Sequence, residues 1–208
     1  MAHIPDGVLA TPILICGAVV TVTAVAIALR RLQPDQIPQA AVMASTFFVA
    51  SLISVPVGVS SVHLILNGLM GLVLGWAAVP AILVALLLQT IFFGYGGVLV
   101  LGVNVMNIAL PAILCALFFR GPLQRASQRG AFVIGALSGA LAVVMTGLLV
   151  CTALAFSSNA FVPAAKVLFA TFVPLALVEA MVTGATVSFL KRVSPELLFA
   201  RGPAHGSI

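Results

Sequence analysis

Long apolar segments constrain this chain more than any other feature of its sequence. A helix needs about 20 mostly apolar residues to cross a bilayer, and in lipid its backbone must satisfy its own hydrogen bonds. Seven segments meet this description, although some are short: about 8–29, 39–57, 62–78, 80–93, 103–119, 131–155 and 167–190. The sequence therefore predicts an all-α integral membrane protein, with about seven transmembrane helices bundled into one domain over residues 1–208.

The placement of basic residues predicts how the bundle is oriented. Eight of the nine Lys and Arg residues fall in 30–38, 120–130 and 191–208, and Lys166 is the exception. Short cytoplasmic loops are enriched in Lys and Arg, so the C-terminal tail is expected in the cytoplasm and the N-terminus outside. Positions 1–7 carry no basic residue, which predicts that the first span is not a cleaved leader. His3 and His63 then lie on the same, outer side of the membrane.

The opening "MAHIPDG" places several nitrogen ligands next to one another. If Met1 is removed, the Ala2 amine, the His3 amide nitrogen and the His3 imidazole lie close together, and the His63 imidazole can complete a square. If Met1 is retained, its amine, two amides and the His3 imidazole already supply four nitrogens, and His63 is axial or idle. Tetragonal nitrogen ligation suits Ni(II) or Cu(II). Residues 1–7 are thus predicted to form a metal-binding tail.

Four further polar residues are candidates for supporting this site. Asp6 could hold a turn in the tail or act behind the ligands. Asn67 follows His63 by four residues, so on a helix it could orient the imidazole or bond to a neighbouring helix. Asn104 and Asn107 could support an outer site or join helices through hydrogen bonds.

Four stretches of the chain resemble the CbiM/NikM family, the substrate-specific membrane subunits of energy-coupling-factor transporters for cobalt and nickel. They are "HIPDG" at the start, "HLILNGLMGLVLGWAAVPAILVALLLQTIFFGYGG" in the middle, "LGVNVMNIALPA" after it and "EAMVTG" near the end. The resemblance implies a seven-helix subunit whose N-terminus inserts from outside and binds metal with His3 and His63. The family usually has the histidine directly after Met, so the resemblance here implies excision of Met1, with Ala2 as the terminal ligand.

The resemblance also implies a cargo and partners. "HIPDG" is more similar to nickel-type members than to the cobalt-type "HIMEG", so Ni(II) is the expected substrate and Co(II) the next. The implied partners are a transmembrane coupling subunit, ATP-binding subunits and a small auxiliary membrane subunit, in a bacterial cytoplasmic membrane. No Walker A pattern occurs in the chain, so ATP hydrolysis is expected in the partners, and no catalytic cofactor is expected.

Other functions fit the sequence less well. An intramembrane enzyme is disfavoured because the chain has no GxSxG or HExxH motif. A self-contained secondary transporter or channel for a divalent cation is the alternative, and it predicts acids along a path. Glu179 is the only acid within a span, and the sequence leaves it open as a structural anchor or a transport residue. Nine scattered basic residues do not make a nucleic-acid surface.

Overall fold

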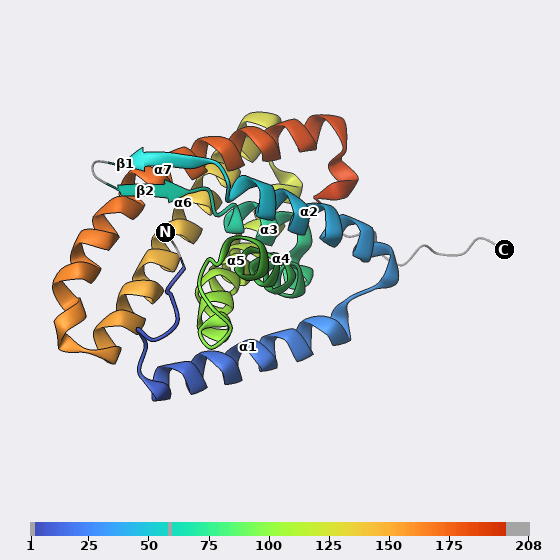
Figure 1. Cartoon of the computed structure of the whole chain (residues 1–208). Coiled ribbons are helices and arrows are strands. Elements are labelled where there is room, and N and C mark those ends of the chain that lie inside the picture. The colour runs from blue at the N-terminus through green and yellow to red at the C-terminus, as the bar shows by residue number, and fades with distance from the viewer. Residues whose placement is uncertain (1–2, 58–59, 199–208) are drawn as a thin grey trace.

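The computed structural model describes residues 3–57 and 60–198 and shows a mainly helical protein (Figure 1). Its described part contains seven α-helices and one β-hairpin. The helices are α1 (Thr11–Arg31), α2 (Ile37–Ala50), α3 (Asn67–Leu74), α4 (Ala78–Phe93), α5 (Leu101–Arg125), α6 (Gln128–Ser157) and α7 (Val162–Val193). The strands are β1 (Ser54–Val57) and β2 (Ser60–His63), and short 3-10 turns lie at Pro34–Gln36, Gly75–Ala77, Asn159–Phe161 and Pro195–Leu197.

Five helical stretches are long and apolar enough to cross a membrane. They are Thr11–Arg31, Asn67–Phe93, Leu101–Arg125, Gln128–Ser157 and Asn159–Val193. The structure thus agrees with the predicted helical membrane class. The count of seven spans stays a prediction, because α2 has only 14 residues and the stretch Asn67–Phe93 combines α3 with α4.

The segment between α2 and α3 differs from the prediction. Spans were expected over 39–57 and 62–78, but the chain leaves α2 after Ala50 and forms the antiparallel hairpin of β1 and β2, with Ser54 opposite His63. Val and Ser are abundant here. β-branched residues such as Val favour strands, and Pro56 cannot donate a helical hydrogen bond. His63 therefore reaches the bundle at the end of a strand, and the helical face that it was expected to share with Asn67 does not form.

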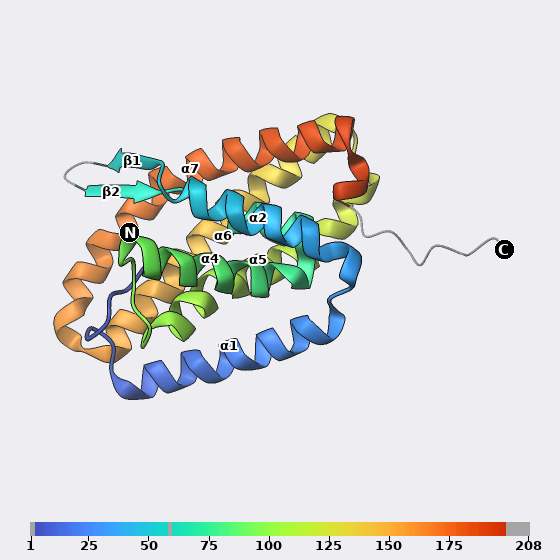
Figure 2. The ribbon, with the colours of Figure 1, turned by 45° about the vertical axis from the view of Figure 1, so that its right-hand side comes forward.

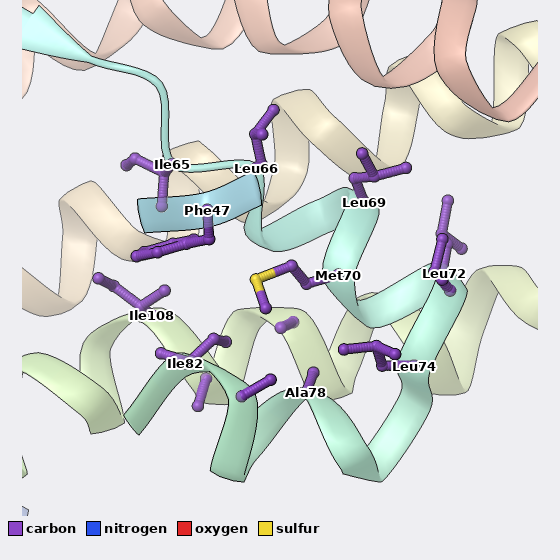
Figure 3. Close-up of a cluster of buried hydrophobic side chains, with 14 of the residues drawn as sticks. Phe47, Ile65, Leu66, Leu69, Met70, Leu72, Leu74, Ala78, Ile82 and Ile108 are labelled. Carbon is purple, nitrogen blue, oxygen red and sulfur yellow. The ribbon is translucent and has the colours of Figure 1, made fainter. Parts of the chain in front are cut away.

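A glycine turn separates α3 from α4. Gly75 has a φ of +57°, a backbone region that glycine enters without the steric cost of a Cβ. After Leu74 the chain turns back, and Ala78 and Ile82 of α4 lie across from Met70 of α3 (Figure 3). This pair of short helices fills the centre of the protein, where α3 is buried along its whole length.

The connecting segments gather at two ends of the bundle. The N-terminal tail, the hairpin and the connection from α6 to α7 lie at one end (Figures 1 and 2). The link from α1 to α2 and the C-terminal end of α7 lie at the other end. Lys191, in the last turn of α7, donates to main-chain oxygens of Leu123 and Gln124 near the end of α5. Basic residues in the last turns of α1, α5 and α7 therefore lie opposite the end that carries His3 and His63.

Close backbone contacts join α3, α6 and α7. A Cβ added to Gly139 of α6 would lie 2.6 Å from the main-chain oxygen of Glu179 on α7. A Cβ added to Gly68 of α3 would lie 2.6 Å from the main-chain oxygen of Ser138 on α6. Small residues permit such approach between membrane helices, where dispersion and hydrogen bonds drive association. The Ser138 hydroxyl adds one such bond to the Gly68 carbonyl at 3.2 Å.

We expect Gly139→Ala to destabilise the protein by about 1–3 kcal/mol, because the added methyl group must push α6 away from α7. Thermal unfolding in detergent, followed by circular dichroism, measures the change. Leu137→Ala, on the exposed face of the same helix, serves as the control and should shift the midpoint far less. Equal shifts for the two variants would contradict the close contact as a source of stability.

Candidate metal site

The structure brings the two predicted histidine ligands together. His3 lies in the tail before α1 and His63 at the end of β2, sixty residues apart in sequence. Their ring centroids are 5.0 Å apart with an interplanar angle of 21°, and both side chains are buried. This contact agrees with the prediction that both imidazoles lie on the same side of the membrane.

The hydrogen bonding of His63 defines which of its ring nitrogens is free. Its Nδ1 lies 3.1 Å from the main-chain oxygen of Leu64. A carbonyl oxygen only accepts, so we assign the ring proton to Nδ1 and a lone pair to Nε2. Nε2 is buried without a hydrogen-bond partner among the described residues, and so is Nε2 of His3. Neutral imidazole with a fixed tautomer is the form that binds transition metals.

Hydrogen bonds hold the tail that carries His3 against α5. The Asn104 side chain accepts from the amide of Ile4 and donates to its carbonyl, both at 3.1 Å. The Asp6 carboxylate accepts from the amide of Val100 at 3.0 Å, just before α5 begins. A carboxylate is favourable at this position because the N-terminus of a helix carries partial positive charge. Asp6 and Asn104 therefore fix the path of the tail.

The loop between α4 and α5 contributes residues that the sequence reasoning missed. Tyr95 stacks on His3, with centroids 6.0 Å apart and an interplanar angle of 17°. A Cβ on Gly97 would overlap the Asp6 carboxylate, and Gly96 has a φ of +78°. "GYGG" belongs to the stretch that resembles the family but was not among the candidate site residues, and its aromatic residue between glycines, on the same side as the tail, was the available signal.

The remaining candidate residues are placed as follows. The Asn67 amide donates to the Ile108 carbonyl at 3.2 Å and to the Thr146 hydroxyl at 2.9 Å, so it joins α3 to α5 and α6. These hydrogen bonds agree with the interhelical alternative for Asn67, and neither of them reaches His63. Both amide atoms of Asn107 are buried without a partner in the described part of the chain. Ala2 and Met1 lie outside the described residues.

Burial and proximity keep the imidazoles neutral. Burial, and after it the adjacent His63 imidazole, lower the pKa of His3 from 6.5 to about 3. Burial is also the main reason why the pKa of His63 is lowered. A lowered pKa means that the neutral form persists to a more acidic pH, so an incoming cation does not have to displace a proton from these rings at neutral pH.

Comparison with known proteins adds independent information. The family described as cobalt uptake substrate-specific transmembrane region, CbiM, matches residues 3–197. A Haemophilus influenzae protein whose name assigns it to metal transport is 40% identical over 198 residues, which cover 94% of this chain and 96% of that protein. The fused nickel transport protein NikMN of Rhodobacter capsulatus is 33% identical over 96% of this chain, which spans only 64% of that longer protein.

A cobalt relative and a solved structure extend these similarities. The cobalt transport protein CbiM of Sorangium cellulosum is 28% identical, and the match covers 94% of each chain. A crystal structure described as a transition metal transporter superimposes with a TM-score of 0.72 at 25% identity, covering 92% of this chain and 93% of that one.

We expect the His3 ring to stay neutral at about pH 5 in the metal-free protein, where an ordinary histidine is mostly protonated. The reason is the lowered pKa, which moves the titration below this pH. Nuclear magnetic resonance of labelled imidazoles measures the protonation state, and His63→Ala and His205→Ala variants assign the signals. Titration of His3 near 6.5 would contradict the buried, stacked arrangement.

Proposed function

The chain belongs to the CbiM family of cobalt uptake substrate-specific transmembrane proteins, and from this premise we propose that it captures Ni(II) from outside the cell for uptake. It is a multi-pass membrane component for cobalt or nickel transport, and Co(II) is the second expected substrate. The observation that carries the proposal is the buried pair of His3 and His63. The His63 Nε2 has no hydrogen-bond partner among the described residues, and a free imidazole nitrogen beside a second imidazole suits a transition metal.

The proposed ligand set combines two side chains with main-chain nitrogens. Within the described part of the chain, no three His, Cys, Asp or Glu side chains gather into a group that could hold a metal. We assign the ligands to the Ala2 amine, the His3 amide nitrogen, the His3 imidazole and the His63 imidazole. If Met1 is retained, its amine, the amide nitrogens of Ala2 and His3 and the His3 imidazole complete the square, and His63 is axial or idle. Four nitrogens in one plane suit Ni(II), whose preferred geometry with such donors is tetragonal.

The end of the bundle that carries the histidines is proposed to face outward. The last turns of α1, α5 and α7, which hold Arg30, Arg31, Arg125, Lys191 and Arg192, lie at the other end. Basic residues favour the cytoplasmic side, so the C-terminal tail 191–208 belongs there and the N-terminus outside. A bacterial cytoplasmic membrane is the proposed location, with the bundle crossing it seven times.

The proposed partners supply energy and an additional segment. We infer a transmembrane coupling subunit, ATP-binding subunits and a small auxiliary membrane subunit. The length of the fused NikMN relative supports the last of these, because this chain spans only 64% of it. Metal capture by the chain and ATP hydrolysis by separate subunits would then make an energy-coupling-factor transporter, and the chain itself would need no catalytic cofactor.

Three polar residues are proposed to support the ligands from behind. Asp6 and Asn104 fix the tail through the hydrogen bonds to Val100 and Ile4. Asn107 lies one helical turn from Asn104 and is proposed to support the site through its buried amide. Asn67 is left out of this group because its hydrogen bonds join helices.

Removing one ligand tests the proposal directly. We expect His63→Ala, and separately one residue added in front of Ala2, to lower Ni(II) affinity by at least about 10- to 100-fold, the range typical for disturbed metal sites. Calorimetric titration of purified protein in detergent measures the affinity, and intact mass shows whether Met1 is present. Undiminished affinity of the extended protein would contradict the terminal amine as a ligand. Uptake without any ATPase subunit would favour a secondary transporter.

Loss of the tail anchor should weaken binding without touching a ligand. Asn104→Leu keeps the volume of the side chain but removes both hydrogen bonds to Ile4, so we expect an affinity loss of about tenfold. Ni(II) titration measures it. Gln89→Leu is the matched control, because it also replaces a buried amide but one without a hydrogen-bond partner among the described residues. If both variants bind as the unmodified protein does, the role assigned to Asn104 is wrong.

A further inference from the structure

Glu179 lies near the middle of α7 and is fully buried. Its Oε1 accepts hydrogen bonds from the amides of Ile65 and Leu66, the second at 2.9 Å. Its Oε2 has no hydrogen-bond partner among the described residues. An acidic side chain inside a membrane bundle is expensive, so its retention calls for a specific task. The two amide donors identify that task, because they belong to the link between His63 and α3.

The link at residues 64–66 needs a partner from outside its own segment. Leu66 precedes the first residue of α3 and has a φ of +51°, which is strained for a residue with a side chain. The first amides of a helix lack intrahelical acceptors, and Leu66 has no side-chain acceptor to offer them. The Asn67 side chain accepts from the Gly68 amide at 3.1 Å. The Glu179 carboxylate accepts the amides at this entry, and its negative charge is favourable at the positive end of the helix.

This link leads directly to the metal ligand. His63 lies two residues before Ile65, and its Nδ1 bonds to the Leu64 carbonyl. The peptide unit between Leu64 and Ile65 therefore faces both groups: its oxygen accepts from the imidazole and its N–H donates to Glu179. Rotation of that single planar peptide would disturb both hydrogen bonds together.

The other side of this connection is held by close helix packing. The main-chain oxygen of Glu179 lies against Gly139 of α6, and Gly139 in turn lies against Gly68 of α3. The backbone that carries the carboxylate is thus fixed relative to the helix whose entry it caps. The position of His63 is coupled in this way to the position of α7.

We propose that Glu179 is a positioning residue for metal capture, which holds the 64–66 link so that the His63 Nε2 faces the tail. This inference rests on the proposed function, because it requires His63 to be a ligand. It assigns no metal contact to Glu179 itself. Any displacement of α7 away from α3 would move His63 and weaken the hold on the ion.

Two substitutions of Glu179 and one matched control test the proposal with Ni(II) alone. Glu179→Leu removes both acceptors and should lower Ni(II) affinity about tenfold or more. Glu179→Gln keeps one neutral acceptor of the same shape, so its loss of Ni(II) affinity should be several-fold smaller than that of Glu179→Leu. Some loss is still expected, because hydrogen bonds to a charged group are about twice as strong as neutral ones. Thr183→Val, one turn away, removes a buried hydroxyl that has no partner in the described part of the chain, and it should leave the affinity unchanged.

Two readouts separate positioning from general stability. In a protein that already carries His63→Ala, Glu179→Leu should cause no further loss of Ni(II) affinity, because Glu179 acts through that ligand. The visible absorption band of bound Ni(II) in Glu179→Leu should move toward that of His63→Ala, whereas a stability effect alone would leave the band in place. We also expect the amide hydrogens of residues 64–70 to exchange faster in metal-free Glu179→Gln than in the unmodified protein. Thr183→Val should leave this exchange unchanged.

The possible outcomes have distinct meanings. If the unmodified protein binds Ni(II), His63→Ala loses binding and both Glu179 variants bind normally, the positioning role is overturned and the proposed function stands. The positioning role is also overturned if Glu179→Leu lowers Ni(II) affinity equally in the unmodified protein and in His63→Ala. If the unmodified protein binds no Ni(II), the proposed function fails and this inference fails with it. If Glu179→Leu does not fold, the positioning role is tested with Glu179→Gln, through its Ni(II) affinity, the absorption band of its bound Ni(II) and its amide hydrogen exchange.

Discussion

Lipid offers no hydrogen-bond partners, and this constraint accounts for the arrangement of most polar side chains in the bundle. Asn67 donates to α5 and α6, Ser138 to α3, and Thr21 to the Gly102 carbonyl at 2.6 Å. Each of these bonds joins two helices, and glycines at the contacts let the backbones approach. Buried polar atoms without a partner in the described chain include the Nε2 atoms of both histidines, which suit a cation better than a hydrocarbon interior.

The site is assembled from three segments that are distant in the sequence. The tail supplies His3, the hairpin supplies His63, and the loop after α4 supplies Tyr95 and the glycines that admit Asp6. Two of these segments are fastened to a helix by a side chain: Asn104 of α5 holds the tail, and Glu179 of α7 holds the link after His63. The described segment ahead of α1 is held in place because Asn104 of α5 bonds to Ile4 and Ser157 of α6 accepts from the Ala10 amide.

Some interpretations of the sequence agree with the structure and others do not, for identifiable reasons. The apolar runs at α1, α5, α6 and α7 are long and uninterrupted, so their prediction as helices was reliable. The prediction of two spans between residues 39 and 78 was not reliable, because apolar residues alone do not distinguish a strand from a helix. Pro56 and the neighbouring Val and Ser residues were the local signal for the hairpin, and the error carried over to Asn67, whose helical relation to His63 depended on it.

Composition and hydrophobic length were sufficient to determine the membrane class and the helical character. The order of nitrogen donors in "MAHIPDG" led to the prediction of a metal site with His3 and His63 as candidates. These follow from the sequence because hydrophobic length, backbone hydrogen bonding and ligand type are local properties. The partners of Asn67, Asn104 and Glu179 and the stacking of Tyr95 on His3 were decided only by tertiary structure. Each depends on which atoms meet across segments far apart in the chain, and packing of the whole bundle sets those distances.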